Sequence, residues 1–259
     1  MPKVSVIVPI DNQAKDPDQT LRSLRSQSFR DLEVIAVESG APEEVRSIIN
    51  RYCEEDKRFS CIHQEEAGVC AARNAGLDQA TGEFVLFADA GDTMPERALT
   101  DLHGAAKKQF ADMVVGLSET ERIDGVHVPA YLTELTDKIK IDKYDPALHQ
   151  ATDLRGKLFR REVIENGAIR FPEFVHMADA VFVYRFSQSC RSIAGCSIPV
   201  YRHFEQADFT DPSMKEAIGE ETVREFFTAF DMIEETVETS YANEENQRRS
   251  QGAPDNEMD

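Results

Sequence analysis

The sequence predicts an α/β fold with a mostly parallel central sheet. In the first half of the 259-residue chain, short apolar runs alternate with amphipathic segments, which is typical of repeated strand and helix units. A content of 41% hydrophobic and 30% charged residues is ordinary for a globular protein of one large domain. We therefore expect a main domain over residues 1–210, an amphipathic helix over 211–240 packed on it, and a polar tail or linker over 241–259.

The order of the elements follows from hydrophobic spacing. The expected strands cover residues 3–9, 32–37, 59–63, 83–88 and 113–117, and the expected helices cover 18–28, 42–52, 69–80 and 95–108. Pro9 is expected to end the first strand, because proline has no N–H for the ladder. Residues 118–150 are polar and weakly periodic, and they predict a loop-rich excursion or lid.

The C-terminal region predicts one more helix. Asp211-Pro212 is an N-cap and first-turn signal. The apolar residues that follow recur at helical spacing, so the helix is expected to bury one stripe: Met214, Ala217, Ile218, Val223, Phe226, Phe227, Phe230, Ile233 and Val237. From Asn243 onward the chain is polar, as in a tail or linker.

Charge excludes some partners. With 48 acidic and 29 basic residues, the net charge of −19 repels nucleic-acid phosphates and anionic lipids. An anionic ligand would need a divalent cation or a few placed arginines to offset this charge. The five cysteines form no Cys-x-x-Cys pair, which favours reduced thiols in the cytoplasm, and no apolar run approaches a membrane span. Location at the inner face of the membrane, further domains and a homo-oligomer all remain open.

Three segments, in this order, resemble the inverting glycosyltransferases of family 2, which have the GT-A fold. Residues 4–12 with 21–35 resemble the opening strand, first helix and second strand of that family. Residues 64–77 with 80–87, which contain Arg73-Asn74, resemble its arginine–asparagine helix and the next strand. Residues 157–161, 170–172 and 179–182 resemble the acceptor-side half. The resemblance covers roughly the first 200 residues.

The resemblance implies a nucleoside-diphosphate sugar as donor, with Pro9, Glu38, Arg73 and Asp89 as its binding residues. In an open α/β sheet, ligands bind beyond the carboxyl ends of the strands, where Pro9, Glu38 and Asp89 are expected to lie. Glu38 takes the place of the usual aspartate that holds the base. Arg73 matches an arginine that contacts the nucleotide, and its alternative is a surface arginine paired with Glu65 or Glu66.

The resemblance also implies a divalent metal, Mn²⁺ or Mg²⁺, held by Asp89 and Asp92. The family's Asp-x-Asp motif has become Asp89-Ala-Gly91-Asp92, so Asp92 serves only if the turn at Gly91 swings it inward. A Gly91→Asp change is expected to rebuild the pair. The alternative is that Asp89 only caps the turn and Asp92 is solvated.

Asp179 is the expected catalytic base, because inverting transfer needs one carboxylate to take the acceptor proton. Ala178 precedes it where the family has a glutamate, and Ser39 replaces a further aspartate. Asp179 could instead be only an acid favourable to a helix dipole. His176 and His203 are weaker candidates for phosphate or metal contacts.

These substitutions leave two principal hypotheses. The first is an active transferase that moves a sugar to a saccharide, polymer or glycoconjugate acceptor in cell-surface polysaccharide synthesis. The second is a catalytically silent GT-A domain that binds nucleotide-sugar or serves as an interaction module. Convergence of Asp89, Asp92 and Asp179 on one cleft favours the first, and a solvated Asp92 favours the second. A third class, a nucleotidyltransferase, lacks its Gly-rich loop after the first strand.

Overall fold

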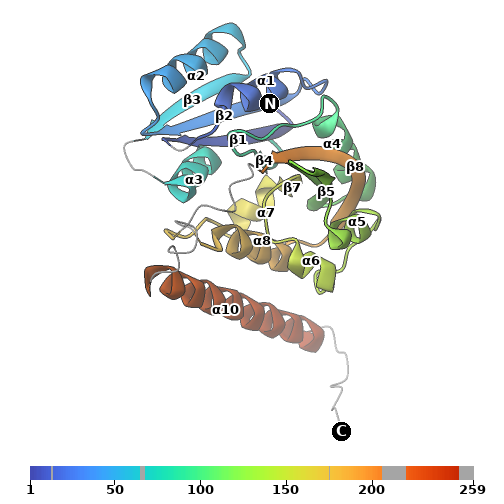
Figure 1. Ribbon diagram of the computed structural model, residues 1–259. Coiled ribbons are helices and arrows are strands. Elements are labelled where there is room, and N and C mark those ends of the chain that lie inside the picture. The colour runs from blue at the N-terminus through green and yellow to red at the C-terminus, as the bar shows by residue number, and fades with distance from the viewer. Residues whose placement is uncertain (13, 65–67, 175, 206–219, 251–259) are drawn as a thin grey trace.

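The computed structural model describes residues 1–12, 14–64, 68–174, 176–205 and 220–250 (Figure 1). An eight-stranded sheet has the order β3-β2-β1-β4-β7-β5-β6, and β8 pairs with β5. The strands are β1 Val4–Asp11, β2 Leu32–Ser39, β3 Phe59–Gln64, β4 Phe84–Phe87, β5 Met113–Arg122, β6 Gly125–His127, β7 Lys157–Arg160 and β8 Ile193–Phe204. The helices are α1 Pro17–Arg25, α2 Glu43–Glu55, α3 Val69–Gln79, α4 Ala98–Gln109, α5 Ala130–Thr136, α6 Pro146–Gln150, α7 Arg161–Asn166, α8 Ala178–Ser189 and α10 Glu220–Ser250.

The sheet is mostly parallel, as predicted. β1 pairs in parallel with both β2 and β4, β2 with β3, and β5 with β8. The antiparallel exceptions are β7, which lies between β4 and β5, and β6, which pairs with the end of β5. The carboxyl ends of β1, β2 and β4 therefore meet at one edge, where a ligand site is expected.

The expectation that Pro9 ends the first strand was wrong. β1 continues to Asp11, with Pro9 opposite Val37 of β2. On the other side of β1, pairing with β4 stops at Ile7. Because β1 has only one neighbour at Pro9, proline is tolerated there as it is on an edge strand.

Two hydrophobic cores cover the two faces of the sheet. One core packs Leu21 of α1, Ile49 of α2 and Leu99 of α4 against β1, β2 and β4. The other packs Leu77 of α3 and Phe182 of α8, among others, against the opposite faces of the same strands. This double covering explains why the strands read as continuous apolar runs and not as alternating ones.

The polar region 118–150 is more ordered than predicted. β5 continues to Arg122 and turns through Gly125, which has a φ of 126°, into β6. The short helices α5 and α6 follow and bury Leu132, Leu135 and Leu148 in the second core. Sequence periodicity missed these elements because each is too short to show a repeat.

The C-terminal helix α10 packs along α8 as an outer layer (Figure 1). It continues to Ser250, beyond the expected end at residue 240, and Asp211-Pro212 and residues 251–259 lie outside the described residues. Of its described side chains, Ala229 is fully buried, whereas Phe227 and Phe230 are 66% and 57% exposed. The predicted buried stripe is therefore only partly buried. No helix among the described residues is long and apolar enough to cross a membrane.

Candidate functional site

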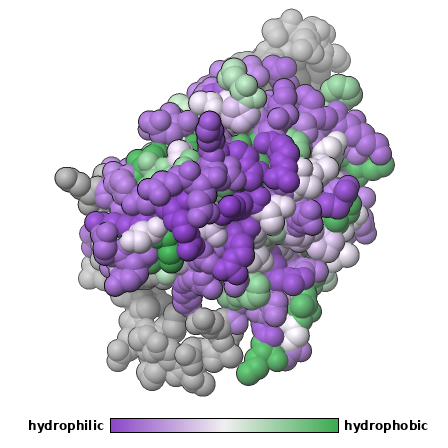
Figure 2. Space-filling view, turned by 90° about the horizontal axis from the view of Figure 1, so that it is seen from above, coloured by the Kyte–Doolittle hydropathy of each residue, from purple (hydrophilic) through white to green (hydrophobic). Residues whose placement is uncertain are grey.

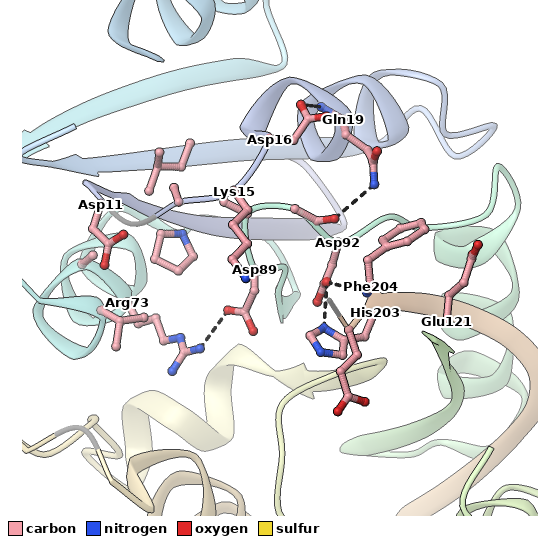
Figure 3. A pocket seen from close by; sticks show the side chains of 18 of the residues that line it. Asp11, Lys15, Asp16, Gln19, Arg73, Asp89, Asp92, Glu121, His203 and Phe204 are labelled. Atoms are coloured by element: carbon pink, nitrogen blue, oxygen red, sulfur yellow. Dashed lines mark hydrogen bonds and ion pairs between the residues drawn. The ribbon is translucent and has the colours of Figure 1, made fainter. Parts of the chain in front are cut away.

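A cavity of about 860 Å³ opens at the carboxyl ends of β1 and β4, within the range of small-molecule sites (Figure 3). Its lining includes Pro9, Arg73, Asp89 and Asp92 of the predicted set, together with Lys15, Ser39, Arg122 and His203. The described surface viewed from above is mainly hydrophilic, with scattered apolar side chains (Figure 2). Four of the six site residues predicted from the sequence therefore line one cavity.

Arg73 is the centre of the site. It lies on α3 and is 5% exposed, yet its guanidinium reaches the cavity. Nη2 donates to Asp89 Oδ1 at 2.8 Å, and Nη1 donates to Asp179 Oδ1 at 2.6 Å. Asp179 is therefore brought beside the cavity although it does not line it. The surface alternative for Arg73 is wrong, because the side chain is buried between two carboxylates.

Asn74 and Phe171 fix Arg73 in place. The Asn74 side chain accepts from the Phe171 N–H and donates to the Phe171 carbonyl, both at 2.9 Å. The Phe171 ring stacks on Phe182 of α8 at 4.3 Å and lies 5.2 Å from the Arg73 guanidinium carbon. No role was predicted for Asn74 from the sequence. In the structure its two hydrogen bonds tie α3 to the segment that leads into α8.

Asp179 lies in the first turn of α8. Burial raises the pKa of its carboxyl above the ordinary value, and Asp89 adds to the rise while Arg73 opposes it. A carboxylate with a raised pKa is a stronger base than ordinary aspartate, which suits a group that accepts an acceptor proton. The side chain is 35% exposed, so an acceptor hydroxyl can reach it.

The turn after β4 is held by α1. Thr20 Oγ1 accepts from the Gly91 N–H at 2.9 Å and donates to the Asp92 carbonyl at 2.7 Å. Gly91 has a φ of 101°, and a Cβ there would stand 2.8 Å from the Lys15 carbonyl oxygen. Gly91→Asp is therefore expected to destabilise the turn and not to rebuild the metal site, because a side chain at this position is strained.

Asp92 is not solvated, but neither of its oxygens is free. Oδ1 interacts with Nδ1 of His203 at 2.9 Å and accepts from the Phe204 N–H at 3.4 Å. Oδ2 accepts from the Tyr201 hydroxyl at 2.9 Å, and the residue is 5% exposed. Asp92 therefore anchors β8 to the turn, and its predicted role as a metal ligand stays a prediction.

Glu38 lies at the end of β2, as expected, but faces a neighbouring cavity of about 650 Å³. Its carboxylate interacts with His63 at 2.9 Å, accepts from the Ala41 N–H at 2.6 Å and pairs with Arg46 at 3.2 Å. These partners hold the pKa of Glu38 below its usual value although burial opposes them. Ser39 lines the main cavity instead, and its buried Oγ has no hydrogen-bond partner among the described residues.

The two histidines separate. His203 lines the cavity and interacts with Asp92, as drawn in Figure 3. His176 instead interacts with Glu225 at 2.7 Å and thereby ties α10 to the segment before α8. The two histidines could not be ranked from the sequence, because nothing in their local pattern shows which one β8 carries into the site.

The side chains at the cavity supply only part of a metal site. Among the described residues, no group of three or more His, Cys, Asp and Glu side chains is arranged to hold a metal ion. Asp89 is 43% exposed, and only its Oδ1 is engaged, by Arg73. This arrangement fits a cation bound through one carboxylate and the phosphates of a ligand, which is how Mg²⁺ is commonly held beside nucleotides.

The profile of the glycosyl transferase family 2 matches residues 5–167. The chain belongs to this family. Relatives include the putative glycosyltransferase EpsH of Bacillus subtilis, 31% identical over 78% of this chain and 60% of EpsH. The poly(ribitol-phosphate) β-N-acetylglucosaminyltransferase TarP of Staphylococcus aureus is 26% identical over 97% of this chain and 78% of TarP.

The solved structures place this family 2 chain in the GT-A fold. The 1–349 fragment of S. aureus TarS with bound UDP has a TM-score of 0.70 at 23% identity, over 78% of this chain and 60% of that fragment. A mannosyltransferase of Pyrobaculum calidifontis, solved with GDP-Man and Mn²⁺, has a TM-score of 0.58 at 23% identity, over 79% of this chain and 56% of that one. The chain thus spans about 60% of the length of EpsH and 37% of the TarS chain solved without truncation to residues 1–349.

Proposed function

We propose that this chain is an inverting glycosyltransferase that moves a sugar from a nucleoside-diphosphate sugar to a hydroxyl of a saccharide, polymer or glycoconjugate. The observation that carries the proposal is the Asp89–Arg73–Asp179 bridge at the cavity. It brings together a carboxylate suited to the donor's cation and a carboxylate suited to the acceptor's proton. Family membership supports the same activity.

The cavity has the groups that donor binding needs. Pro9 lies near the end of β1 and Ser39 at the end of β2, and the Ser39 hydroxyl, which has no hydrogen-bond partner among the described residues, lies just beneath the surface on which a nucleoside would bind. Lys15, Arg73 and Arg122 supply positive charge to a diphosphate. Asp89 would hold the divalent cation, which supplies Lewis-acid stabilisation of the diphosphate.

Asp179 performs the proton transfer. The acceptor oxygen forms a bond to the anomeric carbon as the bond from that carbon to the phosphate oxygen breaks. The proton of the acceptor hydroxyl passes to the Asp179 carboxylate, and the nucleoside diphosphate leaves with the bonding electrons. Arg73 holds the base beside the donor and stabilises its charged form, so that one side chain links both halves of the site.

Asp89 and Asp179 favour the active enzyme over the silent domain, because they meet through Arg73. Asp92 does not count for either hypothesis: it is not solvated, but both oxygens are engaged within the protein. Loss of the second aspartate in the metal motif therefore weakens cation binding without removing the base. We propose that the cation here depends strongly on the donor's phosphates.

Thermal unfolding with UDP or GDP, each with and without Mn²⁺, tests donor binding. A ligand that binds the native state at about 100 times its Kd stabilises the protein by about 2.7 kcal/mol. We expect one nucleotide to raise the Tm, more so with Mn²⁺, and Asp89→Asn to remove the increment due to Mn²⁺. No shift with either nucleotide at millimolar concentration would overturn the proposal. Release of nucleoside diphosphate from a donor and acceptor mixture then separates the active enzyme from the silent domain.

A further inference from the structure

A second cleft, of about 760 Å³, lies between α8 and α10, far from the donor cavity. Its lining includes Lys143, Arg185, Gln188, Arg191 and Glu235. Gln188 is nine residues after Asp179, which is about 14 Å along the helix axis. The cleft adjoins the segment that enters β8, so it lies at the amino ends of β5 and β8 and not at the carboxyl ends of the strands.

The charge of this α8–α10 cleft differs from that of the chain. The protein carries a net charge of −19, but three cationic side chains and one carboxylate line the cleft. Most described arginines form an ion pair with a carboxylate. Arg185 and Arg191 form none with any described carboxylate, and both line this one cleft. An acidic protein offers many partners, so two unpaired arginines in one cleft indicate a binding site for an anion.

The cleft also offers hydrogen-bond donors. The Nε2 of Gln188 is buried and has no hydrogen-bond partner among the described residues. Thr239 and Ser240 of α10 line the opposite wall. Arg191 also lines a smaller cavity of about 320 Å³, where Lys140 adds a cation and Asp142 a carboxylate, so cationic side chains continue past the end of the cleft. Guanidinium groups with nearby amide and hydroxyl donors match the oxygens of a phosphodiester.

We propose that the α8–α10 cleft binds an anionic, phosphodiester-bearing segment of the acceptor polymer, several repeats away from the hydroxyl that reacts at Asp179. This proposal rests on the proposed function. The shape favours a single strand over a membrane surface, because the cationic groups lie inside a cleft.

A remote cationic subsite explains how an acidic protein can hold an acidic acceptor. The general field of the protein repels a polyanion, and the cleft supplies a local attraction that a short acceptor cannot reach. We therefore expect affinity to rise with acceptor length once the chain spans from Asp179 to Arg191. Charge-based binding also weakens as salt is added.

The test measures binding of fluorescently labelled poly(ribitol phosphate) octamer by anisotropy, without donor sugar, to the wild-type protein and to the double variant Arg185→Gln/Arg191→Gln. The matched control is Arg30→Gln, an exposed arginine outside the cleft with no described ion pair. We expect at least a tenfold loss of octamer affinity in the double variant, no loss in Arg30→Gln, and weakening of wild-type binding at higher salt. The UDP-induced rise in Tm is expected to be equal in all three proteins.

Four results would overturn the inference. Three of them are wild-type protein that does not bind the octamer, a double variant that binds it as tightly as wild type, and wild-type binding only to vesicles of phosphatidylglycerol. A monomeric ribitol phosphate that binds as tightly as the octamer would also contradict a remote subsite. Because the UDP shift reports the donor cavity separately, its failure with normal octamer binding would count against the proposed transferase and not against the cleft.

Discussion

Two carboxylate clusters lie at the same cavity and are held in different ways. Asp89 and Asp179 share one arginine, and each keeps an exposed part of its side chain, 43% and 35%. Asp92 is 5% exposed, and its oxygens interact with Tyr201, His203 and Phe204 of β8. The first cluster leaves charge available to a ligand, whereas the second uses its charge to join two parts of the fold.

The comparison shows that an acidic motif can be divided between chemistry and structure. In sequence, Asp89 and Asp92 look equivalent, because each is a carboxylate in one short turn. In the structure, α1 and β8 hold the turn from opposite sides, and only Asp89 faces the ligand space with a free oxygen. Substitutions in the two clusters should therefore separate loss of activity from loss of stability.

The largest effect is expected for Asp179→Asn. The amide keeps the shape of the side chain but cannot accept the acceptor proton, so transfer should fall by about 10² to 10⁴. Nucleotide binding, measured by the UDP-induced rise in Tm, should persist. Single-turnover transfer assays check the prediction, and equal rates in the two proteins would remove Asp179 from catalysis.

The pH profile of transfer tests the same residue without a mutation. Burial raises the pKa of Asp179 above the ordinary aspartate value of 3.8, and the base must be ionised to act. Activity should therefore fall as the pH decreases, with the acidic limb of kcat/KM above pH 3.8. The same limb should be absent from the residual activity of Asp179→Asn. A limb at or below the ordinary value would contradict the assignment.

Asp92→Ala should lower stability more than activity. Truncation leaves the buried Tyr201 hydroxyl and the Phe204 N–H without their acceptor, at a cost of about 2 to 4 kcal/mol in the free energy of unfolding. Asp89→Ala is the matched variant; the buried Arg73 loses one partner but keeps its hydrogen bond to Asp179, so the loss should be smaller, about 1 to 2 kcal/mol. Urea unfolding measures both. A larger loss for Asp89→Ala would reverse the division drawn between the clusters.

The sequence predicted the fold well because the core strands are apolar on both faces. β2 and β3 match their expected ranges closely, and the parallel sheet follows from the alternation with helices. The region 118–150 was missed because β6, α5 and α6 are short. The exposure of Phe227 and Phe230 was missed because helical spacing predicts an apolar stripe on α10 but does not predict which element packs against that stripe.

The candidate site was only partly predictable. Motif position selected Arg73, Asp89 and Asp179, and the structure brings them together: Arg73 lies in α3, Asp89 follows β4, and Asp179 lies in the first turn of α8. Glu38 was expected to face the nucleotide, but His63 and Arg46 engage its carboxylate. Tyr201 had no sequence signal at all, since its role depends on β8 crossing beside the β4 turn, and such long-range contacts leave no local pattern.

Gly91→Ala should destabilise the turn that carries both aspartates. A φ of 101° is unfavourable for a residue with a Cβ, and that Cβ would stand 2.8 Å from the Lys15 carbonyl. We expect a loss of about 1 to 3 kcal/mol. Gly104→Ala, in the open interior of α4, is the control and should stabilise by about 0.5 to 1 kcal/mol. A neutral Gly91→Ala would show that the turn relaxes easily.

The smallest effect is expected for Tyr201→Phe, which removes one oxygen from the second cluster. The Tyr201 hydroxyl accepts from the Asp89 N–H at 3.0 Å and donates to Asp92 Oδ2 at 2.9 Å, so it links the two aspartates through the protein. Asp92 keeps its contacts with His203 and Phe204, and the ring still fills its place in the core. The expected loss is therefore about 1 kcal/mol, or about 2 to 4 °C in Tm.

The control for that variant is Tyr131→Phe, because the Tyr131 hydroxyl makes no hydrogen bond within the described residues and its loss should leave the Tm unchanged. If Asp92 and Tyr201 only hold the turn, Tyr201→Phe should raise the Kd of the nucleotide by less than about tenfold. Transfer should fall in proportion. A loss of transfer as large as that of Asp179→Asn, with the fold intact, would instead mean that the Asp92 cluster takes part in the chemistry, and the division between the two clusters would be wrong.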